Sequence, residues 1–133
     1  MSFKYVRQIP SANEIIAEMP VPEGLRTAKK DRDRDIRDIF EGKSGKFLII
    51  MGPCSADNEN AVCEYVSRLA KLQSQIREKF LIIPRVYTNK PRTTGEGYKG
   101  MMHQPDPKSK PNIVEGLKAL RRMHLRILSE TGM

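Results

Sequence analysis

The sequence predicts an α/β fold in which parallel strands alternate with helices. Residues 46–51 and 80–87 each contain a short, uninterrupted apolar run, which is typical of a strand covered on both faces. The segment between the two runs carries apolar residues at helical spacing. A strand, a helix and a second strand with a connection of this length fit one parallel βαβ unit.

The sequence predicts an amino-terminal arm followed by a folded domain that starts with a helix. Residues 1–24 contain three prolines and one short apolar group, so they are expected to form an extended arm with at most one helical turn. We expect residues 25–133 to form the folded domain. Helical spacing starts at Thr27 and continues to about Glu41, where Gly42 ends the pattern. The alternating Asp/Arg run within this helix has balanced charges, which favours a solvated face over a nucleic-acid contact.

The crossover helix is predicted to start at Asp57 or Asn58 and to run to about Lys79. Pro84 lies inside the second predicted strand, although proline cannot donate a ladder hydrogen bond. An edge position or a bulge would accommodate it. The glycine-rich segment after residue 94 predicts a functional loop rather than a tight connection. A last helix starts after Asn112, and we expect one of its faces to carry the side chains Ile113, Leu117, Leu120, His124 and Ile127.

Composition narrows the possible partners. The chain has 133 residues and a formal net charge of +8, but the charge is spread along it without a polybasic block. Aromatic residues make up 6% and tryptophan is absent, so little is available for base stacking. These features favour small anionic substrates over nucleic acid. Two cysteines do not make a disulfide framework, and no segment resembles a leader or a membrane span, so we expect a cytoplasmic protein.

Chemistry-bearing residues follow both predicted strands. Gly52-Pro-Cys-Ser55 follows the first strand, and a basic, hydroxyl-bearing cluster follows the second: Arg85, Lys90, Arg92, Thr93 and Thr94. Parallel strands end on the same side of a sheet, so the two segments should lie together at the edge where α/β active sites are found. Guanidinium, ammonium and hydroxyl groups suit a small phosphorylated anion. An ordinary polar loop is the alternative interpretation.

Two cysteines and two histidines are the candidate metal ligands of soft or borderline character. Cys54 could bind a metal as a thiolate, or it could be a small buried hydrophobic residue. Cys63 lies within the amphipathic helix and is expected to serve in packing or at the surface. His103 and His124 have no metal-ligand spacing to another candidate, so the residues alone do not assemble a complete site.

Taken together, Gly52-Pro-Cys-Ser55, Arg85-Val-Tyr87 and Lys90-Pro-Arg-Thr-Thr94 resemble the class I 3-deoxy-D-arabino-heptulosonate 7-phosphate (DAHP) synthases. The similarity runs from about residue 25 to the carboxyl end and includes Tyr98-Lys99-Gly100. It implies a (β/α)₈ TIM barrel that condenses phosphoenolpyruvate with erythrose 4-phosphate, the first step of the shikimate pathway. For the complete enzyme it also implies a homo-oligomer.

The same resemblance assigns expected roles to individual residues. Cys54 would be one ligand of a divalent metal of the Mn, Fe, Co or Zn class. Arg85 and Lys90 would hold phosphoenolpyruvate, chiefly through its carboxylate, and Lys90 is the expected catalytic residue. Erythrose 4-phosphate would be held by Pro91, Arg92 and Thr93.

Two departures from the family pattern shape these expectations. The loop after Thr94 is one residue longer than usual. A complete barrel takes roughly 250 residues, and this chain supplies about two of the eight units. The family's other metal ligands, a His, a Glu and an Asp, have no counterpart here. We therefore expect an amino-terminal portion with little activity of its own. The alternative is a non-catalytic α/β module that binds phosphorylated metabolites or a partner chain.

Overall fold

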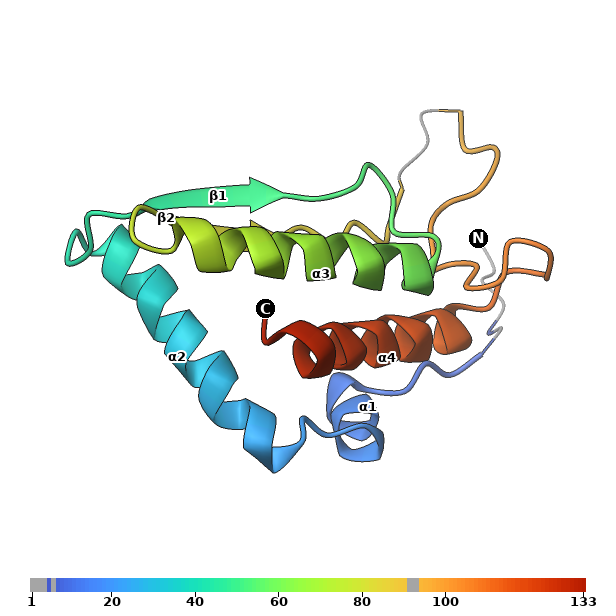
Figure 1. Cartoon of the computed structure of the whole chain (residues 1–133). Helices are drawn as coiled ribbons and strands as arrows, with labels where there is room; N and C mark the ends of the chain where they lie inside the picture. Colours follow the sequence, from blue (N-terminus) through green and yellow to red (C-terminus); the bar gives the residue numbers. More distant parts are fainter. Residues whose placement is uncertain (1–4, 6, 91–93) are drawn as a thin grey trace.

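The order of elements agrees with the predicted α/β alternation. A computed structural model describes residue 5, residues 7–90 and residues 94–133. Its helices and strands are α1 (Ala12–Glu18), α2 (Glu23–Phe40), β1 (Phe47–Met51), α3 (Glu59–Ile76), β2 (Phe80–Pro84) and α4 (Ile113–Thr131). The strands β1 and β2 pair in parallel, from Phe47 opposite Phe80 to Met51 opposite Pro84. Figure 1 shows α3 running alongside this sheet and α4 running alongside α3.

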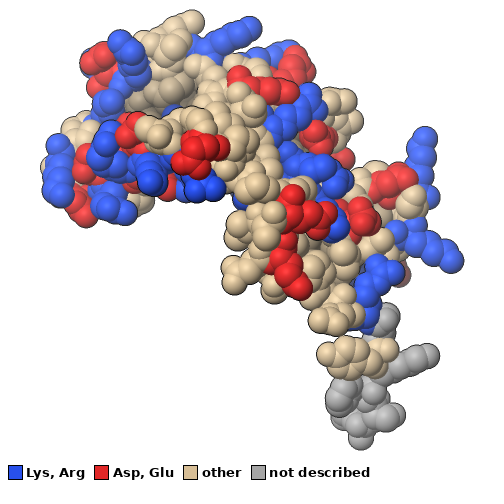
Figure 2. All heavy atoms as spheres, turned by 90° about the horizontal axis from the view of Figure 1, so that it is seen from below, with Lys and Arg blue, Asp and Glu red and all other residues tan. Residues whose placement is uncertain are grey.

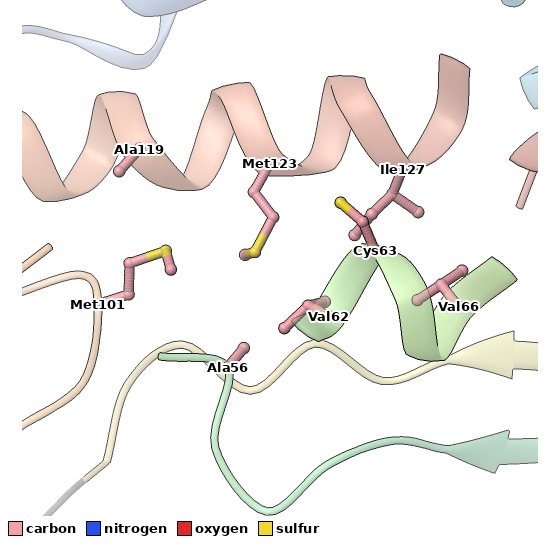
Figure 3. Close-up of a cluster of buried hydrophobic side chains, with 8 residues drawn as sticks. All are labelled: Ala56, Val62, Cys63, Val66, Met101, Ala119, Met123 and Ile127. Atoms are coloured by element: carbon pink, nitrogen blue, oxygen red, sulfur yellow. The ribbon is translucent and has the colours of Figure 1, made fainter. Parts of the chain in front are cut away.

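The core lies between α3 and α4. Val62, Cys63 and Val66 of α3 meet Ala119, Met123 and Ile127 of α4 in one buried cluster, closed by Ala56 and Met101 (Figure 3). Burying side chains of this size stabilises the fold by about 1.5–3 kcal/mol for each large one. Cys63 therefore serves in packing, and its burial raises the pKa of the thiol.

The buried face of α4 differs from the predicted one. Of the five residues expected to share a face, only Ile127 belongs to the buried core cluster, together with Ala119 and Met123 of the same helix. Leu120 packs against the cluster from its rim, and together with Leu117 and His124 it also lines a cavity of about 350 Å³ against α1. The apolar surface of α4 is wide enough to contact two neighbours, α3 on one side and the amino-terminal segment on the other.

The amino-terminal segment forms more structure than expected. A capping box between Ser11 and Glu14 starts α1, which has 7 residues rather than a single turn. This helix is attached to α4 through Glu18, whose carboxylate lies 2.8 Å from Lys118 Nζ. In addition, Arg121 Nε donates to the Met19 carbonyl at 2.9 Å. Residues 12–19 therefore dock on the domain.

The helix α2 has no buried residue, although it is as long as α3. Its basic and acidic side chains form local ion pairs, such as Arg34 with Asp31. The face seen in Figure 2 shows cationic and anionic side chains interspersed, without a continuous basic patch. No helix in the described part of the chain combines the length and the apolarity needed to cross a membrane.

The outer edge of β2 is occupied by side chains. Phe47 N donates to Lys79 O, and Arg85 N donates to Met51 O. The backbone N–H and C=O groups of the odd-numbered residues therefore point toward the other strand, whereas those of the even-numbered residues point away from it. Two even-numbered residues of β2 are bonded by side chains from the helices. Gln73 Nε2 donates to Phe80 O at 2.9 Å, and Gln73 Oε1 accepts from Ile82 N at 2.6 Å. An Arg32 guanidinium nitrogen donates to Ile82 O at 2.7 Å.

The strand register also explains Pro84. This residue is even-numbered in the same ladder, so its nitrogen faces away from β1, where no pairing strand lies among the described residues. A proline at an edge loses no ladder hydrogen bond. The strand ends here, rather than at Tyr87 as the sequence suggested.

Candidate functional site

The segments that follow β1 and β2 meet at the carboxyl edge of the sheet. The structure brings together Cys54 and Lys90, whose Sγ and Nζ atoms lie 3.9 Å apart. They are separated by 36 positions in the sequence. Their proximity follows from the parallel pairing, because both strands end on the same side. Cys54 is exposed, so its interpretation as a small buried hydrophobic residue is wrong.

Close backbone contact joins the segment after β1 to the segment after β2. A Cβ on Gly52 would lie 1.8 Å from Arg85 O, so only glycine allows the two segments to approach this closely. Further along, Ala56 N donates to Tyr87 O at 2.8 Å, and the Ala56 side chain is completely buried. The Cys54 thiol therefore projects from a segment that is fixed at both ends.

Arg85 is fixed by two contacts and remains exposed. Its guanidinium lies over the Tyr87 ring, 4.2 Å from the centroid, and one terminal nitrogen donates to Pro53 O at 3.1 Å. A cation held over an aromatic face at this distance is attracted by the ring. Arg85 keeps further N–H donors that could bind an anion. Sequence reasoning gave Tyr87 no role, although its position two residues after Arg85 on an extended segment places both on one side.

The remaining predicted substrate-binding residues cannot be placed. Pro91, Arg92 and Thr93 lie outside the described residues. Thr94 is exposed, and its Oγ1 accepts from Glu96 N at 3.5 Å. The erythrose 4-phosphate assignment thus stays a prediction.

The donors present do not make a metal site by themselves. Within the described ranges, no group of three or more His, Cys, Asp or Glu side chains could hold a metal ion. His103 lies in the loop before α4, and His124 Nδ1 is 2.7 Å from Leu120 O on α4 itself. Cys54 is thus a single candidate ligand, and one thiol does not hold a divalent metal.

One polar atom at this edge was missed by sequence reasoning. Ser55 Oγ is buried and has no hydrogen-bond partner among the described residues. A buried hydroxyl without a partner is costly unless a ligand or water satisfies it. Its position next to Cys54 in the Gly-Pro-Cys-Ser segment was the available signal.

Comparison with known proteins identifies the family to which this arrangement belongs. The model of the DAHP synthetase I family matches residues 16–131. A phospho-2-dehydro-3-deoxyheptonate aldolase of Corynebacterium glutamicum is 33% identical over 123 residues, which are 92% of this chain and 33% of that protein. A putative enzyme of the same name from Schizosaccharomyces pombe is 40% identical over 119 residues, 90% of this chain and 32% of the relative.

The fold agrees with this relationship. The solved phospho-2-dehydro-3-deoxyheptonate aldolase of Francisella tularensis SCHU S4 superposes with a TM-score of 0.82 at 27% identity. The match covers 96% of this chain and 38% of that structure. The chain spans about a third of the length of the curated relatives it matches. Since the family model covers most of the chain, the chain belongs to the DAHP synthetase I family.

Proposed function

We propose that this chain supplies the phosphoenolpyruvate-binding edge of a DAHP synthase, which condenses phosphoenolpyruvate with erythrose 4-phosphate to DAHP and phosphate. The observation that carries the proposal is the meeting of Cys54 and Lys90 at 3.9 Å, beside the exposed Arg85 guanidinium. At the carboxyl edge of a parallel sheet, the two cations could bind a small anion, and the thiol beside them could serve as a metal ligand.

Each side chain has a chemical role that it can fill from its own position. Lys90 would place a point charge, and Arg85 its planar fork of donors, against the carboxylate of phosphoenolpyruvate. The bond from Arg85 to Pro53 O and the Tyr87 ring below it would keep the fork oriented. We further propose that Pro91, Arg92 and Thr93 bind erythrose 4-phosphate, with the last two on its phosphate.

Cys54 would contribute one ligand to a divalent metal of the Mn, Fe, Co or Zn class. When bound, such an ion would polarise the aldehyde of erythrose 4-phosphate. The described residues supply only this one soft donor, so further ligands have to come from elsewhere. As one ligand, the Cys54 thiol would hold the ion close to Lys90.

The finer architecture is also a proposal. The order β1, α3, β2, α4 with parallel pairing is what the first units of a (β/α)₈ barrel would look like. An amino-terminal arm over residues 1–24, a barrel domain from residue 25, assembly as a homo-oligomer and a cytoplasmic location complete it.

Binding of phosphoenolpyruvate is the first test. Calorimetric titration of residues 1–133 with phosphoenolpyruvate should show binding that Lys90→Ala and Arg85→Ala each weaken about tenfold or more, the loss expected for one charge-assisted hydrogen bond. Lys110→Ala removes an exposed lysine from the 103–111 loop, to which no role in the site is assigned, and serves as the matched control. Equal affinity for all four proteins would contradict the assignment of the site.

Turnover is the second test. Residues 1–133 replace the matching third of the Corynebacterium glutamicum relative, and phosphate release from both substrates is followed with Mn²⁺. We expect activity that Cys54→Ala and Lys90→Ala abolish. Since the described residues hold a single candidate metal ligand, a non-catalytic module that binds phosphorylated metabolites is the second candidate function. Binding by the chain together with a silent chimaera would favour that alternative.

A further inference from the structure

The backbone around Lys90 is held by the chain that returns from the loop. Lys90 N donates to Lys99 O at 2.8 Å, and Met102 N donates to Thr88 O at 3.2 Å. Residues 88–90 and 99–102 therefore run next to each other, although a loop separates them in the sequence. These two bonds fix the backbone from which the Lys90 side chain starts.

Gly100 lies in the middle of this contact. A Cβ at Gly100 would lie 2.3 Å from Thr88 O and 2.9 Å from Lys90 N, and both distances are shorter than a Cβ atom can approach another heavy atom without a clash. Its φ of +102° is also one that residues with a side chain rarely adopt. Any larger residue would have to push the backbone of Lys90 away from its place.

The returning segment is in turn anchored to the core. Met101 is only 4% exposed and belongs to the buried cluster with Met123 and Ala119 (Figure 3). On the other side of this turn, a Cβ on Gly116 of α4 would lie 1.9 Å from Met102 O. The turn is thus pressed directly onto the first part of α4.

We propose that Gly100 and Gly116 are positioning residues for Lys90. Through backbone contact alone they connect α4 to the Lys90 backbone and so set the distance between the Lys90 ammonium and the Cys54 thiol. This inference deepens the proposed function and rests on it for the meaning of Lys90. The Lys90 side chain is long and flexible, so fixing its backbone through these contacts would restrict the positions that its ammonium group can take near the substrate.

A proximity reaction measures the arrangement without any substrate. The reagent o-phthalaldehyde joins an amine and a neighbouring thiol into a fluorescent isoindole. Cys54 is exposed and Cys63 is buried, so wild-type protein should form an isoindole between Lys90 and Cys54. Lys90→Ala and Cys54→Ala should remove the signal, which identifies the pair.

Gly100→Ala is compared with Gly97→Ala, and Gly116→Ala with Gly24→Ala. Gly97 also has a positive φ, of +79°, and Gly24 is also helical, but a Cβ at either would meet nothing within 4 Å. We expect isoindole formation to slow about tenfold or more in Gly100→Ala and Gly116→Ala, because misplacing a reacting group by about 1 Å can lower a reaction rate up to about a hundredfold. The two controls should react at the wild-type rate. Alkylation of Cys54 by iodoacetamide should be equal in all of them, since the thiol itself is not moved.

A folded Gly100→Ala or Gly116→Ala protein that reacts as fast as its control would overturn the proposal. If neither variant folds, amide hydrogen exchange on the wild-type protein decides. Slow exchange at Lys90 N–H and Met102 N–H supports the proposed backbone contact between residues 88–90 and 99–102, and exchange at the rate of an unstructured peptide refutes it. Phosphoenolpyruvate titration of the same proteins separates the two proposals. The expected isoindole pattern without binding of phosphoenolpyruvate would support Gly100 and Gly116 as positioning residues and contradict the proposed function.

Discussion

At the edge of β2, side chains from two helices bond three of the outward-facing backbone groups, whereas the corresponding groups of β1 have no partner among the described residues. The exposed set in β1 comprises the N–H and C=O groups of Leu48 and Ile50. The side chains nearby are apolar and exposed: Phe47 is 70% and Ile50 62% accessible. A bare apolar edge is a template for another strand, and a capped one is not.

The two edges of the sheet should therefore behave differently: the edge of β2 is already hydrogen-bonded by side chains, whereas the edge of β1 is available to pair with another strand. Beside the β2 edge lies a groove of about 310 Å³ between α2, β2 and α4, lined by side chains that include Ile36, Ile83 and Leu128. A strand entering this groove to extend the proposed barrel would have to displace Gln73 and Arg32 from the backbone of β2. Three side-chain hydrogen bonds would then be exchanged for main-chain ones.

Gln73→Leu should break the capped edge most severely. The amide bonds both Phe80 O and Ile82 N, and a leucine of similar size would leave both groups without a protein partner. We expect the free energy of unfolding to fall by about 2–3 kcal/mol, because an unpaired, partly buried group costs about 1–3 kcal/mol. Urea denaturation measures this loss. Gln75→Leu, on the exposed side of the same helix, is the control and should change little.

Arg32→Ala should cost less, about 1–2 kcal/mol, because it removes one charge-assisted hydrogen bond to a single carbonyl. Burial lowers the pKa of Arg32, and the nearby Asp35 partly opposes that shift. Arg34→Ala removes an exposed guanidinium paired with Asp31 on the same helix. A surface pair contributes about 0–1 kcal/mol, so the two variants should differ in thermal unfolding. Equal melting temperatures would show that the Ile82 carbonyl is satisfied equally well by water.

Sequence reasoning could predict the elements but not the capping of β2. Apolar runs and helical spacing are local, so both strands and the parallel pairing were predictable, and with them the meeting of Cys54 and Lys90. The contact from Arg32 to Ile82 O spans 50 positions, and no local pattern signals it. Pro84 seemed out of place until the register showed which way its nitrogen faces.

Faces and close approaches were harder to predict than elements. The face of α4 was predicted from helical spacing of mostly large side chains, but the buried residues include the small Gly116 and Ala119. At Gly116 the missing side chain lets the Met102 backbone come close. Gly100 was part of the Tyr98-Lys99-Gly100 segment of the family resemblance, but no role beyond that of a loop glycine was predicted for it. Its contact with the backbone of Lys90 depends on how the loop returns, which spacing does not encode.

Pro84→Ala tests whether the capped edge also depends on a missing donor. The new N–H would face outward, away from β1, and the unfolded chain would gain freedom. We expect a loss of about 0.4–1 kcal/mol in the free energy of unfolding, the usual range for removing a compatible proline. Pro105→Ala, in the loop before α4, reports the same entropy effect without an edge. A stabilised Pro84→Ala protein would contradict the edge interpretation.

Ile50→Lys should change the stability least and the association most. Ile50 is 62% exposed, so its replacement should alter the free energy of unfolding by no more than about 0.5 kcal/mol. A lysine on an edge strand discourages pairing with another strand, because that would desolvate its charge. Sedimentation velocity over a concentration series should show association of the wild-type protein and much less of it for Ile50→Lys. Ile16→Lys adds the same charge at a 49% exposed position of α1 and should associate like the wild type. If both lysine variants lowered association equally, net charge rather than the β1 edge would be responsible, and the contrast between the two edges would have no consequence in solution.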